Sequence, residues 1–427
     1  MIKIYDMETL EDREILFRGG SGADVSAPVA EILRAVQERG DAALREYTLR
    51  FDGAAPDALA VTAEEVDQAA AQVEPAFLAV LEEAAEHIRA YHARQKRESF
   101  VMTEREGVVL GQRIIPLARV GIYVPGGTAA YPSTVLMNAI PARIAGVGEI
   151  IMVTPPWRDG AVNPHILAAA KIAGVTRIYK VGGAQAVAAL AYGTGTIPQV
   201  DKIVGPGNAY VAEAKRQVFG RVNIDMIAGP SEVLVLADGR SNPAWVAADL
   251  LSQAEHDRMA AAVLVTDSRP LAEAVAHELE RQLAALPRAE IARASLEANG
   301  KLIVCRDLRE GIAVANRIAP EHLELCVDNP FDYLGEIQNA GSVFLGRYNP
   351  EPMGDYFAGP NHTLPTMGTA RFYSPLSVDD FVKKSQFSYY TRDALARDYR
   401  KVSLFARKEG LDAHARAVDI RFEGGEA

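Results

Sequence analysis

The sequence predicts an α/β protein with two Rossmann-like parallel-sheet lobes, an N-terminal helical layer and a small helical C-terminal tail. Short runs rich in Val and Ile alternate with Ala-rich segments of helical spacing, which is typical of strands and helices in a parallel sheet. These runs form two series. The first has VGIYV at 120–124, EIIMV at 149–153, RIYKV at 177–181 and KIV at 202–204, and the second has VLVLA at 233–237, AAVLVT at 261–266, KLIVC at 301–305, HLELCV at 322–327 and GSVFLG at 341–346.

Helical patterns flank the two series. Residues 26–50 and 62–98 carry apolar side chains at helical spacing, and Thr62 with Glu65 matches a capping box. After Pro375 the pattern becomes helical again. A tail this short cannot fold alone, so we expect it to dock on its own body or on a partner subunit. The predicted regions are a helical one at 1–110, a first α/β lobe at 111–232, a second α/β lobe at 233–365 and a helical tail at 366–427.

Composition restricts the possible partners. The 427 residues carry a net charge of -11, which argues against nucleic acid, because no face could easily gather enough Lys and Arg to displace counterions from many phosphates. The N-terminal stretch is charged, and no window approaches the roughly 18 apolar residues of a membrane span. The cysteines, Cys305 and Cys326, fall in strand-like runs and are expected to be buried thiols. We therefore expect a cytoplasmic protein, without membrane contact, that acts on a small molecule.

Three glycine-rich loops follow predicted strands of the first lobe. Open parallel sheets bind ligands at the carboxyl ends of their strands, and glycine lets the backbone approach a phosphate closely. The loops are Pro125-Gly126-Gly127-Thr128, Gly182-Gly183-Ala184-Gln185 and Gly205-Pro206-Gly207-Asn208. None completes the GxGxxG fingerprint, because Tyr210 stands where the last glycine would follow Gly205 and Gly207. Each loop alone could be a tight turn, whereas three together favour a nucleotide site.

Polar residues in the second lobe permit a metal site without demonstrating one. Ser231 lies in a turn before strand 233–237, where it could be an ordinary turn residue. On the helix expected at 243–256, Asp249, Gln253 and His256 share a face, which is usually solvated but could present metal-ligating atoms. The sequence contains no HExxH, CxxC or HxH spacing, so such a site would have to be assembled from distant segments.

Glu321 and His322 stand side by side at the start of a predicted strand. Neighbouring side chains on an extended chain point to opposite sides, so the pair could serve as a base and a water activator. The alternative is a capping Glu and a packed His. Further candidates follow the last predicted strand or flank the break at Gly410, and they are Asp355, His362, Glu409 and His414.

Nine ordered blocks make the chain similar to the histidinol dehydrogenase family over nearly its whole length. They are VGIYVPGGTAAYPSTVLMNAIPARIAGV, VGGAQAVAALAYGT, DKIVGPGNAYVAEAKRQV, IDMIAGPSEVLVLAD, DLLSQAEHD, APEHLEL, EPMGDYFAGPNHTLPT, SPLSVDDFVKKS and EGLDAHARAV. The resemblance implies oxidation of L-histidinol through L-histidinal to L-histidine, the last step of histidine biosynthesis. It also implies that two NAD molecules are used in succession and that each site holds one zinc ion.

The resemblance assigns roles to the candidate residues. It implies that His322 is the general base of both oxidations and that Glu321 activates the water that hydrates the aldehyde. The side chains that would contact the substrate are Ser231, Gln253, His256, His322, Asp355, Glu409 and His414. Those that would bind zinc are Gln253, His256, Asp355 and His414.

The resemblance also places the dinucleotide and a second subunit. NAD would bind on Tyr123, Gln185 and Asn208, which lie beside the three glycine loops. Family members are homodimers with intertwined tails, so Glu409 and His414 are expected to complete the partner's site. The stretch 385–400 contains no motif that we can interpret, and the role of His362 stays open.

Two alternatives remain at this point. A relative with the same architecture could oxidise another small diol or amino alcohol to an acid, because a fold does not fix a substrate. The presence of Ser231, Glu409 and His414 favours histidinol. A noncatalytic ligand-binding protein could also keep the fold, but it would need neither the base nor the water activator of the Glu321–His322 pair.

Overall fold

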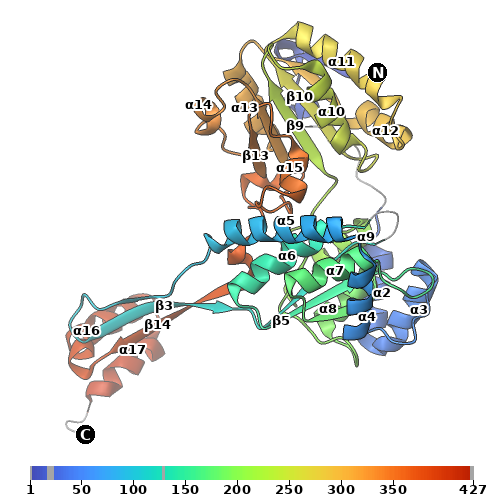
Figure 1. The fold of residues 1–427 in the computed structure, drawn as a ribbon. Coiled ribbons are helices and arrows are strands. Elements are labelled where there is room, and N and C mark those ends of the chain that lie inside the picture. The colour runs from blue at the N-terminus through green and yellow to red at the C-terminus, as the bar shows by residue number, and fades with distance from the viewer. Residues whose placement is uncertain (1, 17–23, 127–129, 424–427) are drawn as a thin grey trace. The chain divides into compact units, whose positions relative to one another are not determined.

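A computed structural model of the chain describes residues 2–16, 24–126 and 130–423 (Figure 1). The chain divides into two compact units. The first contains Met1–Lys96 and Leu117–Phe381, and the second contains Arg97–Pro116 and Val382–Ala427. Both parallel sheets belong to the first unit, and a small antiparallel sheet belongs to the second. The expected mixed α/β fold with two parallel-sheet lobes is confirmed. The four predicted segment boundaries stay a prediction.

The first lobe is a five-stranded parallel sheet with the strand order β6-β5-β4-β7-β8. Its order reverses between the neighbours β4 and β7, and ligands bind at such switch points in open parallel sheets. The strands are β4 (Arg119–Tyr123), β5 (Glu149–Thr154), β6 (Arg177–Lys180), β7 (Lys202–Val204) and β8 (Asn223–Ile224). The helices between them are α6 (Pro132–Ala145), α7 (Pro164–Ala173), α8 (Gly183–Tyr192) and α9 (Ala209–Val218).

The N-terminal helical layer packs on this first lobe. Leu33 and Leu44 are buried in one core cluster with α8 residues such as Leu190. The helical pattern predicted at 26–50 is divided at Gly40, whose backbone has a positive φ of 52°. The layer consists of α2 (Ser26–Arg39), α3 (Asp41–Asp52), α4 (Ala63–Gln72) and α5 (Pro75–Ala93), and α4 begins with the predicted capping box.

The second lobe is a six-stranded parallel sheet with the order β1-β11-β10-β9-β12-β13. Its switch point lies between β9 and β12. The strands are β1 (Lys3–Asp6), β9 (Glu232–Ala237), β10 (Ala261–Thr266), β11 (Lys301–Val304), β12 (His322–Cys326) and β13 (Ser342–Leu345). The helices are α10 (Pro243–Ala254), α11 (Arg269–Leu283), α12 (Ala289–Asn299), α13 (Leu308–Ile318), α14 (Phe331–Leu334) and α15 (Glu351–Tyr356), with the short α1 (Asp12–Ile15) after β1.

Three strands and the start of a fourth lie in stretches where the sequence pattern indicated helices. β1 adds an edge strand to the second sheet although it precedes the helical layer. β14 (Val382–Tyr390) pairs antiparallel with β3 (Val108–Pro116), which also pairs with β2 (Phe100–Met102). Every β14 residue after Val382 is exposed, so the strand lacks the alternation of buried and exposed residues that would identify it.

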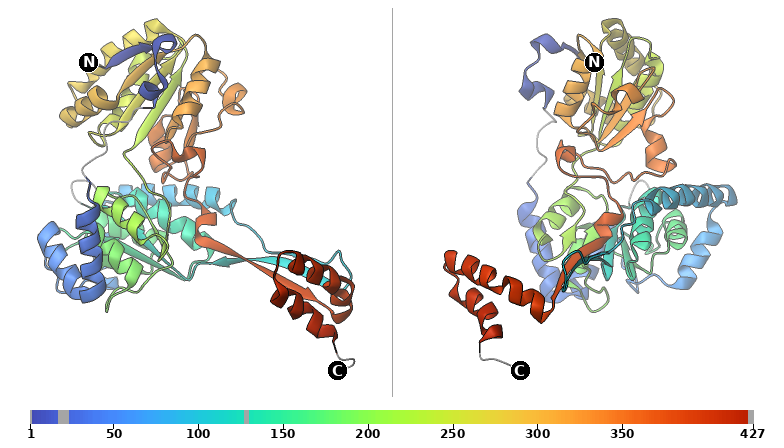
Figure 2. Two further views of the ribbon diagram at one scale, coloured as in Figure 1. Left: turned by 180° about the vertical axis from the view of Figure 1, so that it is seen from behind. Right: turned by 90° about the vertical axis from the view of Figure 1, so that its left-hand side faces the viewer.

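The second unit ends in the expected helical tail. α16 (Arg392–Lys408) and α17 (Asp412–Asp419) follow β14 and lie beside one another (Figure 2). Single-turn 3-10 helices complete the described elements of the chain, at Met7–Thr9, Thr369–Arg371, Val378–Phe381 and Ile420–Phe422.

Candidate active site

His322 and Glu321 lie at the amino-terminal edge of the second sheet. His322 begins β12 and pairs in register with Val233 of the neighbouring β9. The preceding helix α13 ends at Ala319, which adopts a left-handed conformation with φ of 51° and so turns the chain toward the strand. The chain just before β13 approaches the Glu321 backbone closely. A Cβ on Gly341 would lie only 2.5 Å from the Glu321 carbonyl oxygen. Glycine is therefore required at position 341.

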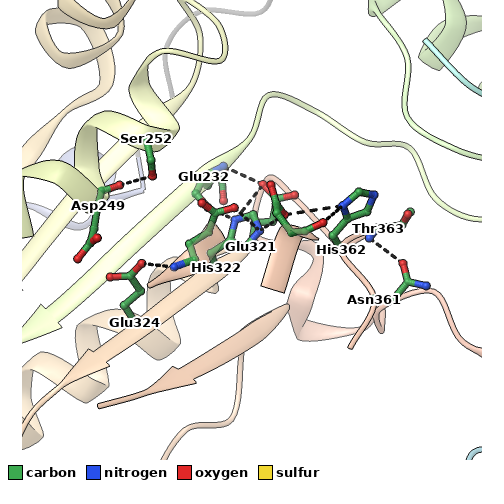
Figure 3. Close-up of polar contacts among 11 residues, drawn as sticks. Glu232, Asp249, Ser252, Glu321, His322, Glu324, Asn361, His362 and Thr363 are labelled. Atoms are coloured by element: carbon green, nitrogen blue, oxygen red, sulfur yellow. Dashed lines mark hydrogen bonds and ion pairs between the residues drawn. The ribbon is translucent and has the colours of Figure 1, made fainter. Parts of the chain in front are cut away.

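The hydrogen bonds of His322 determine which ring nitrogen is free. Nδ1 lies 2.9 Å from the Glu232 carbonyl oxygen, and since a carbonyl only accepts, Nδ1 donates (Figure 3). Nε2 then carries the lone pair, and it is buried without a hydrogen-bond partner among the described residues. Burial lowers the pKa of His322, although the nearby Asp355 carboxylate opposes this effect. In its neutral form the ring is a base whose lone pair lies on the buried Nε2.

Glu321 is held by the same residue of β9. Its Oε2 accepts a hydrogen bond from the Glu232 amide at 2.8 Å and lies 3.6 Å from His322 Nδ1. Burial raises the pKa of Glu321 well above its usual range. A carboxylate in such a place is a stronger base than in water, which suits it to remove a proton from a water molecule.

Helix α15 brings two further carboxyl groups to His322. Glu351 Oε1 lies 3.7 Å and Asp355 Oδ1 lies 3.9 Å from His322 Nε2. Burial raises the pKa of Glu351 to about 10, and the Asp355 charge adds to this effect. One ligand atom from each of the three residues lies within 4.8 Å of the others, so this group could hold a cation. His362 lies on the far side of Asp355, with Nδ1 3.0 Å from its carbonyl oxygen.

Glu351 was not among the site residues predicted from the sequence. The only signal in the sequence was its spacing of four residues before Asp355, which places both side chains on one face of a helix. That helix is too short to be predicted from periodicity, and the glutamate by itself resembles an ordinary helix-start acid.

The next two predicted ligands, Gln253 on helix α10 and His256 just after it, differ in their exposure to solvent. Gln253 is 1% exposed, and its Oε1 has no hydrogen-bond partner within the described chain. His256 follows the helix and is exposed, and its charge contributes to lowering the pKa of His322. Gln253 is therefore buried, although its helix face was expected to be solvated. A buried amide oxygen without a hydrogen bond is costly unless a ligand binds it.

His256 also lines a cavity of about 400 Å³ in the first unit. Most of its wall is apolar and comes from α5 and the start of α6, and Tyr356 and Phe357 follow Asp355 along the chain. Polar groups enter from Glu255, His256, Arg288 and Ser133. An apolar pocket with a few convergent polar groups is the usual form of a small-molecule site.

A second group of polar side chains lies further along β12 and consists of Asp249, Glu324 and Cys326. Glu324 is buried, and burial together with the neighbouring Asp249 charge raises the pKa of Glu324 to about 9. Burial raises the pKa of Asp249 to about 6, while its hydrogen bond with Glu324 opposes the shift. Cys326 completes this group, with Sγ 4.0 Å from Glu324 Oε2.

The predicted nucleotide residues gather at the switch point of the first lobe. The Tyr123 hydroxyl accepts a hydrogen bond from the Gly183 amide at 3.0 Å, and burial raises the pKa of Tyr123 to about 12. Gln185 is buried, and neither polar atom of its amide has a partner among the residues that the structure covers. Asn208 caps α9 by accepting hydrogen bonds from two backbone amides. Gly127 and Thr128 of the first glycine loop lie outside the described residues.

Gly205 occupies the tightest of these loops. Its φ is 110°, and a Cβ there would lie 2.2 Å from the Tyr123 carbonyl oxygen. Its amide donates to Asp225 Oδ2 at 2.8 Å, and its carbonyl accepts from Lys215 Nζ at 3.0 Å. Lys215 and Asp225 also form a buried ion pair with each other. The loop between β7 and α9 is thus fixed at both backbone groups.

Three more predicted residues stand apart from this group. Ser231 is half-buried directly before β9. Glu409 and His414 are exposed and belong to the second unit, where they line an apolar groove of about 830 Å³ between α16 and α17. The convergence of Gln253, His256, Asp355 and His414 on one zinc ion therefore stays a prediction.

Two parallel-sheet lobes and a buried Glu–His pair define this chain as a two-lobed α/β protein with a candidate acid–base site. The family model described as histidinol dehydrogenase matches residues 18–422. The chain belongs to the histidinol dehydrogenase family.

Similar proteins agree with this assignment. A histidinol dehydrogenase from Listeria monocytogenes is 56% identical over 399 residues, which is 93% of each chain. One from Geobacillus kaustophilus is 58% identical over 398 residues, which is 93% of this chain and 94% of the relative. The crystal structure of histidinol dehydrogenase from Elizabethkingia anophelis matches with a TM-score of 0.94 and 40% identity, over 99% of this chain and 98% of that one. Among the described helices, none has the length and apolar character needed to cross a bilayer.

Proposed function

We propose that the protein catalyses the four-electron oxidation of L-histidinol to L-histidine via L-histidinal, with zinc and two NAD, as the last step of histidine biosynthesis. The observation that carries this proposal is the buried His322, whose Nε2 has no hydrogen-bond partner among the described residues, next to the buried Glu321. The name shared by the relatives supplies the substrate.

His322 is the general base of the first oxidation. Nε2 accepts the proton of the substrate hydroxyl, while the hydrogen bond from Nδ1 to the Glu232 carbonyl holds the ring and stabilises the charge that develops on it. When bound, the dinucleotide takes up the hydride. The low exposure of His322, 3%, keeps bulk water away from its lone pair.

Glu321 prepares the second oxidation. Its carboxylate takes a proton from water as that water adds to the aldehyde, which gives a hydrated aldehyde. This product is itself an alcohol, so His322 can accept a proton from it in the same way as before. One pocket can thereby carry out both oxidations.

The residues expected to hold zinc fit that ion. Gln253, Asp355 and His256, with His414 from the tail, offer the oxygen and nitrogen donors that zinc accepts. The buried Gln253 Oε1 without a partner in the described chain is the strongest single support. When bound, zinc would orient the substrate beside His322, and Ser231 and Glu409 would contact the substrate.

The proposed dinucleotide site uses Tyr123, Gln185 and Asn208. The Gln185 side-chain amide has no hydrogen-bond partner among the described residues. This supports the proposal, because a buried amide without partners is costly in the free protein. Tyr123 and Gly205 lie at the switch point of the sheet, where dinucleotides bind in related folds.

The proposal includes a homodimer in which Glu409 and His414 complete the partner's site. The apolar groove beside these two residues supports it, because the exposed Phe405 and Leu411 in its wall would be covered in a dimer. A cytoplasmic location is part of the same proposal, and the two free, buried cysteines fit a reducing compartment.

NADH formation tests the function directly. The purified protein should reduce NAD with L-histidinol, and prolonged chelation should abolish the activity until zinc is restored. Absence of NADH with histidinol but turnover of another small amino alcohol would favour a relative of different specificity. Absence of turnover with every alcohol would favour a noncatalytic binding protein. Full activity after chelation would refute the zinc assignment.

A further inference from the structure

Glu324 is a buried carboxyl group that the proposed chemistry does not use. It lies between His322 and Cys326 on one face of β12, because alternate residues of a strand share a face. The other face carries Leu323 and Leu325, which belong to an apolar cluster. With 1% exposure, Glu324 would be costly unless it were hydrogen-bonded.

Its first partner is the start of α15. Glu324 Oε1 accepts a hydrogen bond from the Glu351 amide at 2.7 Å. The first amides of a helix have no partner within the helix. The N-cap residue of α15, Pro350, makes no side-chain hydrogen bond, so Glu324 supplies the cap from another element.

Its second partner belongs to α10. The carboxyl oxygens of Asp249 and Glu324 lie within 4.8 Å of each other, and Figure 3 shows the two groups facing each other. A hydrogen bond between them requires a proton on one of the carboxyl groups. Asp249 lies one helical turn before Gln253, so the contact fixes the part of α10 that carries this predicted ligand.

We propose that Glu324 is a positioning residue that binds α15 and α10 to β12, and thereby sets Asp355 and Gln253 relative to His322. This inference rests on the proposed function, since it concerns the same zinc and substrate site. Each of the three elements carries one of these groups, and Glu324 contacts all three through its own strand, the Glu351 amide and Asp249. Glu324 acts as a hydrogen-bonding side chain, and its negative charge is not required.

Three variants separate this role from a general effect on folding. In Glu324→Gln, the amide oxygen still accepts from the Glu351 amide and the amide nitrogen can donate to Asp249. Glu324→Met has a similar length but accepts no hydrogen bond. Ser241→Ala is the matched control, because it removes another buried hydrogen bond to β12, from Ser241 Oγ to the Cys326 carbonyl at 2.8 Å.

The readouts are the zinc dissociation constant, measured by competition with a chromogenic chelator, and kcat and KM for L-histidinol. Glu324→Met should weaken zinc binding and lower kcat by about 10- to 100-fold, as is usual when an outer-shell partner is removed. Glu324→Gln and Ser241→Ala should stay within about threefold of wild type, since the first keeps both hydrogen bonds and the second lies outside the site. Urea unfolding of each variant identifies losses caused by instability.

The outcomes distinguish this inference from the proposed function. If wild type neither binds zinc nor oxidises histidinol, the proposed function fails. If wild type does both and Glu324→Met behaves like wild type, the positioning role fails alone. Loss of zinc affinity in Glu324→Gln equal to that in Glu324→Met would also overturn it, since it would show that the charge is needed.

Should Glu324→Met fail to fold, Glu324→Asp replaces it. The shorter side chain keeps the charge but withdraws its oxygens from the Glu351 amide. An impaired Glu324→Asp beside an active Glu324→Gln supports positioning, and the reverse order refutes it.

Discussion

Glu232 holds both members of the candidate acid–base pair through its backbone. Its amide donates to Glu321 Oε2, and its carbonyl accepts from His322 Nδ1. Backbone groups of a central strand are among the most rigid in a protein, so they fix the position of both side chains. In the neutral ring they also fix the His322 tautomer, which leaves Nε2 for the proposed substrate.

Substitution of the pair should separate the two oxidations. Glu321→Gln can still accept from the Glu232 amide, so we expect it to oxidise histidinol to histidinal nearly normally and to lose about 10²- to 10⁴-fold in the step from histidinal. His322→Asn should lose about 10²- to 10⁴-fold in both steps. The measurement is pre-steady-state NADH formation from histidinol and from histidinal. Equal losses in both steps for Glu321→Gln would contradict the role given to that carboxylate.

Asp52 should make the stability of the protein depend on pH. It ends α3, it is half-buried, and its Oδ2 has no hydrogen-bond partner among the described residues. Burial raises the pKa of Asp52 to about 6. As pH rises from 4 through 6, the unfolded chain releases this proton more readily than the folded one, so wild type loses stability.

Asp52→Asn removes this loss. After allowance for partial solvent exposure, we expect the free energy of unfolding of this variant, measured with urea, to exceed that of wild type by about 1 to 2 kcal/mol at pH 8. At pH 4 the difference should be small. The exposed Asp57→Asn is the control and should change little at either pH. An equal gain of Asp52→Asn at both pH values would exclude ionisation as the cause.

At the scale of the elements, the site depends on loops and helix ends that strands hold in place. The loop after β7 is bound at Gly205 on both sides, and α15 is capped from β12. The first arrangement fixes a helix start at the switch point of its sheet, and the second holds a helix start against β12, two residues from His322. The first faces the proposed dinucleotide, and the second faces the proposed substrate.

The close approach at Gly205 gives a test with a matched control. Gly205→Ala must adopt φ of 110° and also displace the Tyr123 carbonyl, whereas Gly220→Ala adopts φ of 98° with no atom within 4 Å. Both substitutions carry about 1 to 3 kcal/mol of backbone strain. Gly205→Ala should lower the free energy of unfolding further and raise KM for NAD several-fold. Equal effects of the two substitutions would show that the contact with Tyr123 does not matter.

At the scale of the whole molecule, the proposed site needs groups from both compact units. Gln253, His256 and Asp355 belong to the first, and Glu409 and His414 belong to the second. A tail that reaches a partner subunit would make each site dependent on two chains.

Mixing two inactive variants tests this arrangement. We expect His322→Asn and His414→Ala each to be inactive alone, and to recover about a quarter of wild-type activity after mixed refolding, because half of the dimers contain both chains and one of their two sites is intact. The measurement is NADH formation after co-expression or refolding from urea. If one chain supplies its own His414, the mixture stays inactive.

Sequence patterns determined much of this protein. Apolar runs located the strands of both parallel sheets except β1 and β8, because burial on both faces produces continuous β-branched segments. The glycine loops indicated the nucleotide side, since the close approach at Gly205 permits no side chain. The adjacency of Glu321 and His322 indicated a candidate acid–base pair, which lies at the amino edge of its sheet and not at the carboxyl ends where ligands of parallel sheets usually bind.

Tertiary structure decided what depends on contacts between distant segments. β14 is a strand because β3 supplies its partner, and its own exposed residues give no period-2 signal. Glu351 and Glu324 have ordinary surroundings in sequence, and Asp249 was indicated only as one polar residue on a helix face. They become part of the site only because α10, β12 and α15 pack together and remove their carboxyl groups from water, and neither burial nor its effect on pKa can be deduced before the fold is known.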